Sequence, residues 1–194
     1  MKRTLLVAVA LVLAGCSANT IDEPTEAATA ASQPNRTTTE AATPTAPTSP
    51  RGNLIKAFGE EAGLGCATET CDVEFVLDAP TPATECDGTY SPKFGELLAF
   101  PVRVETQPGA NMQPFGGMWN PNSFSALIAS GVTVPGITSA AAYGCAESDR
   151  TIPDSLSPAS VYEGFVVLDV PTDATALIFQ PNSLGGQGGW EWEL

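Results

Sequence analysis

Apolar and polar side chains alternate with a period of two through most of the chain, and this pattern constrains its fold more than any other feature. In residues 96–106 one face carries the apolar side chains of Leu98, Phe100, Val102 and Val104. Successive side chains of a β-strand point to opposite sides, so the pattern predicts a strand buried on one face. Pro101 falls on the other face. Because proline has no N–H to donate, we expect a bulge or a sheet edge there.

Similar short segments follow one another along the chain, separated by turns rich in Pro, Gly and Asp. Strands are expected at residues 55–58, 73–77, 96–106, 123–128, 162–170, 174–180 and 189–194. Short helical turns are expected only at residues 139–145 and 157–160. About seven short strands joined by such turns are typical of an all-β sandwich, in which two sheets pack face to face.

Residues 1–15 have the layout of an export signal. Lys2 and Arg3 precede a short apolar run that ends in small residues. As a helix this run is too short to span about 30 Å of hydrocarbon. Leu13-Ala14-Gly15-Cys16 resembles the bacterial lipobox, in which the cysteine thiol is lipidated and the signal is cut just before it. The resemblance implies a lipoprotein anchored through Cys16 on the extracytoplasmic face of the cell membrane; the alternative is an ordinary secretory signal with a coincidental cysteine.

Residues 16–53 are rich in Ala, Thr, Pro and Ser and contain no aromatic residue. Such a segment cannot bury enough apolar surface to offset the entropy lost on ordering it. We therefore expect a disordered tether over residues 16–53. The remaining residues, 54–194, are long enough for one folded domain with a single core.

Composition excludes several classes of function. The 194 residues include no histidine, so neither a Ser-His-Asp triad nor a His-ligated metal site can be built. Asp and Glu number 22 against 8 Lys and Arg, which gives a formal net charge of −14. Binding to phosphates needs clustered Lys and Arg. We expect neither a nucleic-acid partner nor a cofactor.

Four cysteines follow Cys16: Cys66, Cys71, Cys86 and Cys145. An exported chain folds in an oxidising compartment, so disulfides are expected. Of the three possible pairings we favour Cys66–Cys71, which closes a local loop, and Cys86–Cys145. The longer link would stabilise the fold by about 4 kcal/mol in the chain-entropy model. The alternative is a metal site made of four thiolates, although the spacings lack the paired C-x2-C of zinc sites.

The C-terminal part of the chain resembles a known family. The stretch from Tyr162 to Pro171, YEGFVVLDVP, is followed by Ala176-Leu177-Ile178-Phe179, a Gly-rich turn and Trp190-Glu191-Trp192. These residues look like the last three strands of the telokin-like, immunoglobulin-like domains of actinobacterial lipoproteins and secreted antigens. Residues 96–106 look like the family's central strand. The resemblance covers residues 54–194 and implies an immunoglobulin-like β-sandwich, with no catalytic residues to carry over.

Two acidic groups are candidates for a calcium site. Asp72, Glu74 and Asp78 lie close together in the sequence, as do Glu85 and Asp87. Carboxylates that share one face of a strand can bind Ca²⁺. No calcium-loop motif is present, so a solvated acidic surface is the alternative.

A third acidic group suggests a hydrolase. Glu147 and Asp149 lie beside Arg150 and could form an acid/base pair of the kind used in glycoside hydrolysis. The alternative is an exposed polar loop after Cys145. With so many acidic residues in the domain, some carboxylates must be neighbours by chance.

The Gly/Pro/Asn-rich loop at residues 112–119 carries Phe115, Met118 and Trp119. Such side chains can anchor a protein partner, and they can equally tuck under the loop to cap the sandwich. Trp190 and Trp192 alternate with glutamates and are expected in the core.

Together these features favour a lipid-anchored extracytoplasmic module that binds or has a structural role at the cell envelope and is not an enzyme. A protein partner in the envelope is the expected ligand. A ligand- or Ca²⁺-binding lipoprotein and a carboxylate-based hydrolase are the alternatives.

Overall fold

The structure is a computed structural model and describes residues 46–67, 70–185 and 188–194. The predicted signal peptide, Cys16 and most of the predicted tether lie outside the described residues. Within these ranges no helix is long and apolar enough to cross a bilayer.

The strands form two five-stranded sheets. The first contains, in spatial order, β1 (Leu54–Lys56), β10 (Trp190–Glu193), β9 (Ala174–Phe179), β6 (Phe124–Ile128) and β7 (Thr133–Pro135). The second is built on β5 (Gly95–Thr106), which pairs on one side with β8 (Val161–Pro171) and on the other with β3 (Val73–Leu77) and β4 (Thr81–Pro82). β2 (Glu61–Leu64) pairs with β3. β1 runs parallel to β10, and the other paired strands are antiparallel.

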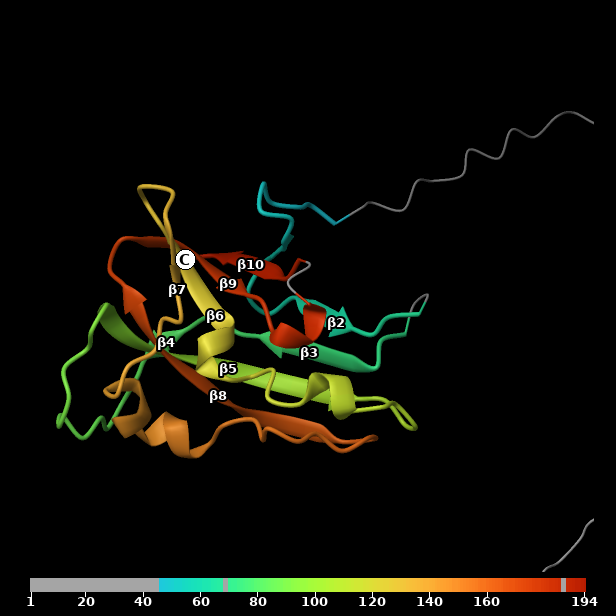
Figure 1. Cartoon of the computed structure of the whole chain (residues 1–194). Coiled ribbons are helices and arrows are strands. Elements are labelled where there is room, and N and C mark those ends of the chain that lie inside the picture. Colours follow the sequence, from blue (N-terminus) through green and yellow to red (C-terminus); the bar gives the residue numbers. More distant parts are fainter. Residues whose placement is uncertain (1–45, 68–69, 186–187) are drawn as a thin grey trace, which may run out of the picture. The chain divides into compact units, whose positions relative to one another are not determined.

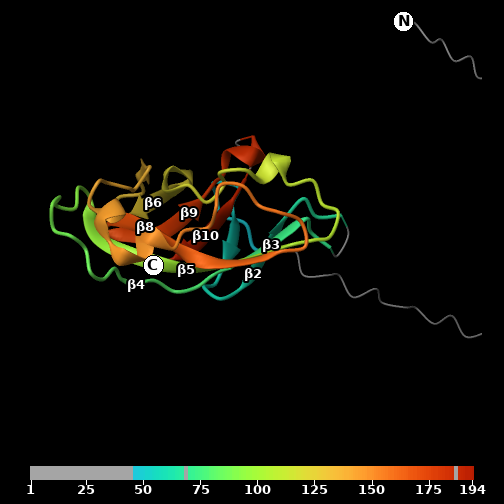
Figure 2. The same cartoon turned by 90° about the horizontal axis from the view of Figure 1, so that it is seen from below.

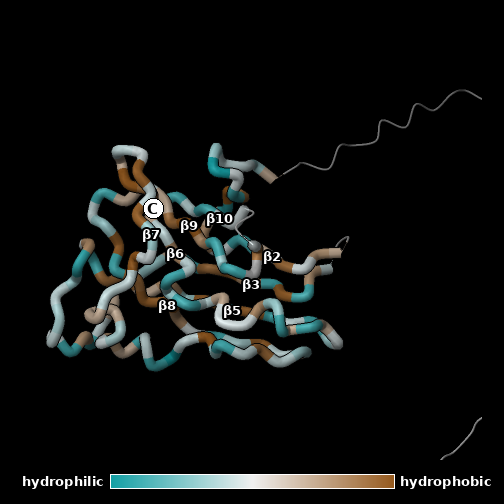
Figure 3. The backbone as a smooth tube through the Cα atoms, in the orientation of Figure 1, coloured by the Kyte–Doolittle hydropathy of each residue, from teal (hydrophilic) through white to brown (hydrophobic). Residues whose placement is uncertain are grey.

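The two sheets form the two layers seen in Figures 1 and 2, and the expected all-β, immunoglobulin-like β-sandwich is confirmed. The most apolar stretches of the backbone follow strands of both sheets, including β5 and β8 (Figure 3). Each of the seven expected strands is present within a residue or two, because their alternation is strong. The three-, two- and four-residue strands β7, β4 and β2 were not expected, because segments so short carry almost no periodicity.

Among the described residues, five short 3-10 helices lie in the loops: η1 (Gln113–Phe115), η2 (Pro121–Ser123), η3 (Ala142–Gly144), η4 (Ala146–Asp149) and η5 (Asn182–Leu184). η3 falls within the helical turn expected at residues 139–145. The prediction of a helical turn at residues 157–160 is wrong, because the structure has no helix there. Residues 157–160 instead lie against the end of β5, where Thr106 hydrogen-bonds to them. Its hydroxyl donates to the Ser157 carbonyl at 2.7 Å, and its N–H donates to the Ser160 carbonyl at 2.9 Å.

An aromatic cluster fills the space between the sheets around Phe179. The Phe179 ring stacks on Phe124 at a centroid distance of 4.6 Å and on Trp119 at 4.9 Å. Phe75 of the opposite sheet meets Trp119 and Trp190 edge-on at 5.0 and 4.9 Å. These rings come from both sheets and from the loop after β5, so the cluster joins the two layers. The expectation that Trp190 and Trp192 lie in the core is confirmed.

Pro101 lies within a central strand, so the sheet edge expected there is wrong. β5 is paired on both sides, but β3 ends at Leu77, opposite Val102, and β4 begins at Thr81, opposite Ala99. Pro101 faces the gap between those two strands, where its carbonyl accepts the Asp78 N–H at 3.0 Å. The missing N–H of proline therefore falls where no ladder bond is needed.

The folded region begins before residue 54, which corrects the expected end of the tether. Ser49 and Asn53 are buried, and the Ile55 N–H donates to the Pro47 carbonyl at 2.8 Å. Arg51 forms a two-point ion pair with Glu191. Glu191 lies on the outer face of β10, as its alternation with the tryptophans predicts, but this segment covers it. The composition of residues 46–53 gave no sign of this, because their contacts are polar and local.

The loop at residues 112–119 does not present its large side chains to a partner. Phe115, Met118 and Trp119 are only 7%, 2% and 6% exposed. They lie in the same core cluster as Phe75 and Phe179. Of the two alternatives for this loop, the structure shows the cap, and the partner-binding interpretation of these three side chains is wrong. The loop leaves the end of β5 and folds back over the sandwich, so burying its rings removes apolar area from water.

Replacing Trp119 with alanine is therefore expected to destabilise the fold. We expect Trp119→Ala to lower the free energy of unfolding by about 3–5 kcal/mol, the range for a large buried aromatic side chain. Urea denaturation followed by circular dichroism measures this. Tyr143→Ala is the control, because Tyr143 is 57% exposed and should shift the value by about 0.5 kcal/mol or less. A loss as small as the control's would contradict the capping role.

Candidate functional site

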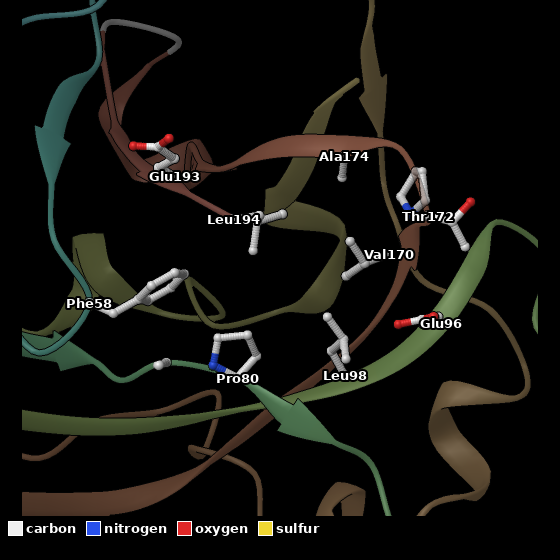
Figure 4. Close-up of a pocket in the computed structure, with 11 residues that line it drawn as sticks. Phe58, Pro80, Glu96, Leu98, Val170, Thr172, Ala174, Glu193 and Leu194 are labelled. Atoms are coloured by element: carbon white, nitrogen blue, oxygen red, sulfur yellow. The ribbon is translucent and has the colours of Figure 1, made fainter. Parts of the chain in front are cut away.

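A pocket of about 400 Å³ opens at one end of the sandwich, lined by residues of both sheets. Its walls are mainly apolar and include Phe58, Pro80, Leu98, Val170 and Leu194. Figure 4 shows these side chains arranged around an open space. The volume and the apolar lining are those of a small-molecule site, since ligand pockets typically measure about 300–1,000 Å³.

The pocket exists because several strands end or begin here with small or turn-forming residues. β8 ends at Pro171 and β9 starts at Ala174, whose methyl group leaves room that a larger side chain would fill. β3 ends at Leu77, and the following turn carries Pro80 across the opening. At the opposite end of β9, Phe179 sits in the packed aromatic cluster. The same pair of sheets is thus filled at one end and open at the other.

The floor of the pocket is continuous with the core. Val170 is buried in the core cluster, and Phe58, Leu98 and Ala174 are half-buried against it. Phe58 stacks on Trp192 at a centroid distance of 6.3 Å and an interplanar angle of 14°. These contacts hold the walls in place without a ligand.

Two carboxylates accompany the apolar walls. Glu96 and Glu193 both line the pocket and lie on opposite sides of it in Figure 4. Glu193 also lines a neighbouring hollow with Phe58, Lys56 and Glu60. There Lys56 and Glu60 form their own ion pair at 2.6 Å. This pair does not involve Glu193.

The expected disulfide pairing is confirmed, because Cys66 is bonded to Cys71 and Cys86 to Cys145. The alternative four-thiolate metal site is therefore wrong. Gly63 on β2 makes room for the first bond, since a Cβ there would lie 2.4 Å from the Cys71 sulfur.

The residues considered for calcium do not form a site in the described part of the chain, where no group of three or more acidic or cysteine side chains could hold a metal ion. Asp72 lies against Gly65, and Asp78 is exposed after β3. Asp87 accepts the Thr89 N–H at 2.8 Å in a turn. Their carboxylates make local contacts instead of converging.

Glu147 has a structural contact instead of the predicted acid/base role. Its carboxylate accepts the Thr84 hydroxyl at 2.6 Å and the Thr84 N–H at 3.2 Å. The hydroxyl bond is the main reason that its pKa lies below the usual value, outweighing the opposing effect of burial. Thr84 precedes Cys86 and Glu147 follows Cys145, so this contact ties together the loops that the disulfide joins. Asp149 and Arg150 are exposed.

Asp169 is a buried carboxylate that the sequence analysis did not single out. It is 0% exposed and accepts three successive backbone N–H groups, from Lys93, Phe94 and Gly95, at 2.6, 3.1 and 2.9 Å. Burial alone would raise its pKa, but hydrogen bonds, including these three, outweigh it and lower the pKa. Asp169 thereby fixes the start of β5, which carries Glu96 and Leu98 into the pocket.

The sequence analysis did not find the pocket either. The residues that line it come from five separate parts of the chain. Taken singly, each of them has the sequence pattern of an ordinary strand or turn. The one signal was the interruption of strands by Pro80 and Pro171, which indicated where strands stop but not that their ends meet.

Comparison with known proteins identified no matching family model and no matching curated protein. Among solved structures, the chain is similar to MPT63, a secreted protein from Mycobacterium tuberculosis, with 16% sequence identity and a TM-score of 0.48 over 73% of this chain and 98% of that one. These values are too low to transfer any property to this chain. The resemblance to telokin-like lipoprotein domains remains a prediction.

The pKa shift of Asp169 predicts a pH-dependent contribution to stability. Because the folded pKa is below the unfolded one, the contribution is complete above about pH 4 and is lost as the pH falls through the folded value. We expect Asp169→Asn to lower the free energy of unfolding at pH 7 by about 1–3 kcal/mol. The difference from the unaltered protein should shrink under acid conditions.

Urea denaturation over a pH series measures this difference. The exposed Asp149→Asn is the control for loss of one negative charge. A difference for Asp169→Asn that stays constant with pH, or that grows in acid, would contradict the assigned role.

Proposed function

We propose that the protein is a lipid-anchored, extracytoplasmic binding module without catalytic activity, and that it takes up an apolar ligand in the pocket at the open end of the sandwich. The observation that carries this proposal is the pocket of about 400 Å³ lined by both sheets. Its walls are held by core contacts, so a ligand would meet a preformed site.

The disposition of the carboxylates favours binding over hydrolysis. Glycoside hydrolysis needs two carboxylates that face the same bond. The Glu147 carboxylate is hydrogen-bonded to Thr84, and Asp149 is exposed. In the pocket, Glu96 and Glu193 are exposed and the rest of the lining is mainly apolar, so few polar groups are present to hold a sugar (Figure 4).

The location is supported by the sequence. A charged start, a short apolar run and Leu13-Ala14-Gly15-Cys16 together favour lipidation of Cys16 and export. Attachment of two or three acyl chains would hold the protein firmly at a membrane, whereas one chain holds it only marginally.

The anchor is tested by Cys16→Ser in the native host or a bacterium that processes lipoproteins. Serine offers no thiol to receive the diacylglyceryl group, so we expect the variant to lose lipid labelling and to leave the cell membrane fraction. Metabolic labelling with a radioactive fatty acid and cell fractionation measure the two effects. Ser17→Ala, next to the modified residue, is the control. Unchanged labelling and membrane retention of Cys16→Ser would rule out the anchor.

The pocket is tested with a small neutral apolar compound, 4-phenylbutan-1-ol. We expect it to bind the full chain in phospholipid nanodiscs, measured by titration calorimetry against empty nanodiscs. Ala174→Phe places a ring in the pocket and is expected to weaken binding at least about tenfold, because the ligand volume is lost.

Leu98→Trp fills the same space from the opposite sheet and serves as a second variant. Gln113→Phe, exposed on η1, is the control for an added ring elsewhere. Thermal unfolding identifies any variant that does not fold. Binding that is absent from the unaltered protein, or unaffected by both filling variants, would refute the pocket as the ligand site.

A further inference from the structure

We propose that the ligand of the end pocket is an amphipathic organic cation, with an apolar or aromatic body inside the pocket and an ammonium group at the rim, beside the exposed carboxylate of Glu96 or of Glu193. This inference rests on the proposed function, because it names the chemical class of the ligand for the same site.

The charge of the pocket is entirely of one sign. The charged side chains in its lining are Glu96 and Glu193, and no Lys or Arg contributes to the wall. In the described part of the chain, neither carboxylate forms an ion pair or a side-chain hydrogen bond. Two unneutralised carboxylates therefore flank an apolar space.

The basic side chains of the described residues are all engaged elsewhere. Three form ion pairs: Arg51 with Glu191, Lys56 with Glu60, and Arg103 with Glu105 and Glu163. The remaining two lie over aromatic rings, Lys93 over Phe94 and Arg150 over Phe165, each 4.6 Å from the ring centroid. A cation for the pocket carboxylates would have to come from outside the described domain.

The apolar part of the site suits the body of such a ligand. Phe58, Leu98 and Leu194 are only partly covered by the protein, although Phe58 and Leu98 pack against the core. An apolar group placed among them would remove area from water, at roughly 25 cal/mol per Å². The ring of Phe58 also offers a face to a nearby ammonium group, which is attracted to aromatic faces.

The two rim carboxylates discriminate between ligand classes. A neutral ligand gains nothing from the two carboxylates, which are exposed and keep their water. An anion would add repulsion from both carboxylates and from a chain with a formal net charge of −14. An ammonium group at the rim gains a favourable interaction with the carboxylate beside it and is attracted by the field of the whole protein.

Three probes that differ only in the charged end test the inference: 4-phenylbutylamine, 4-phenylbutan-1-ol and 4-phenylbutyrate. Each is titrated by calorimetry into the full chain in nanodiscs, with empty nanodiscs subtracted. We expect the amine to bind roughly fivefold more tightly than the alcohol, the effect of a partly exposed ion pair, and the carboxylate to bind most weakly. Added salt should reduce the preference for the amine.

The double variant Glu96→Gln/Glu193→Gln removes both charges with little change of shape. It should bring the affinity for the amine down to that for the alcohol and leave the alcohol unchanged. Glu61→Gln, on the edge strand β2 and outside the pocket, is the matched control and should alter neither value.

The outcomes separate this inference from the proposed function. If the alcohol binds as tightly as the amine, and the filling variants abolish both, the pocket stands and the cationic class is wrong. Tighter binding of the carboxylate probe also overturns the cationic class. If none of the three probes binds the unaltered protein, both the pocket function and this inference are wrong. A preference for the amine that persists in the double glutamine variant refutes the assignment to Glu96 and Glu193.

Discussion

The packing of aromatic rings around Phe179 is the interaction on which the rest of the structure depends. Rings from β3, β9, β10 and the loop after β5 meet there and fix the spacing of the two sheets at that end. Trp119 fills the space beside Phe179 by stacking on its ring. At the Ala174 end of the same strand no such loop folds in, and the sheets enclose the pocket instead. One sandwich therefore packs its aromatic rings around Phe179 and leaves the pocket at the Ala174 end of the same strand.

Buried carboxylates organise the loops that frame this arrangement. Asp169 accepts hydrogen bonds from three N–H groups at the start of β5. Glu191 binds Arg51 in the segment that precedes β1. Glu147 accepts the Thr84 hydroxyl and so links the loops joined by Cys86 and Cys145. In each case hydrogen-bond donors lower the pKa of a carboxyl group that burial alone would raise. The pocket carboxylates Glu96 and Glu193 differ, because no donor side chain of the described domain meets them. Other exposed carboxylates, such as Asp149, also lack a partner, and what distinguishes Glu96 and Glu193 is their place in the lining of the pocket.

The strands, the fold class and the disulfide pairing could be predicted because each leaves a local or countable signal. Alternation over residues 96–106 specifies a strand and its buried face, and four cysteines in a chain predicted to be exported allow three pairings. The burial of Trp119 could not be predicted, because the sequence of a Gly-rich loop does not show whether its aromatic side chain turns inward or outward. Glu191 was expected on the outside, and it is, but Arg51 and Asn53 cover it from a segment that composition assigned to the tether.

By itself the sequence determined the period-two strands and the excess of negative charge, because these follow from residue types and their spacing alone. It favoured one of three cysteine pairings, and the structure shows that pairing. It also predicts an export and lipidation signal over residues 1–16. Only the tertiary structure decided that Phe58, Leu98, Val170 and Leu194 would share one pocket and that Glu96 and Glu193 would flank it. Those residues are far apart along the chain, and their meeting depends on strand pairing and on which end of the sandwich the aromatic rings fill. The site is thus a consequence of packing, and no local pattern could have revealed it.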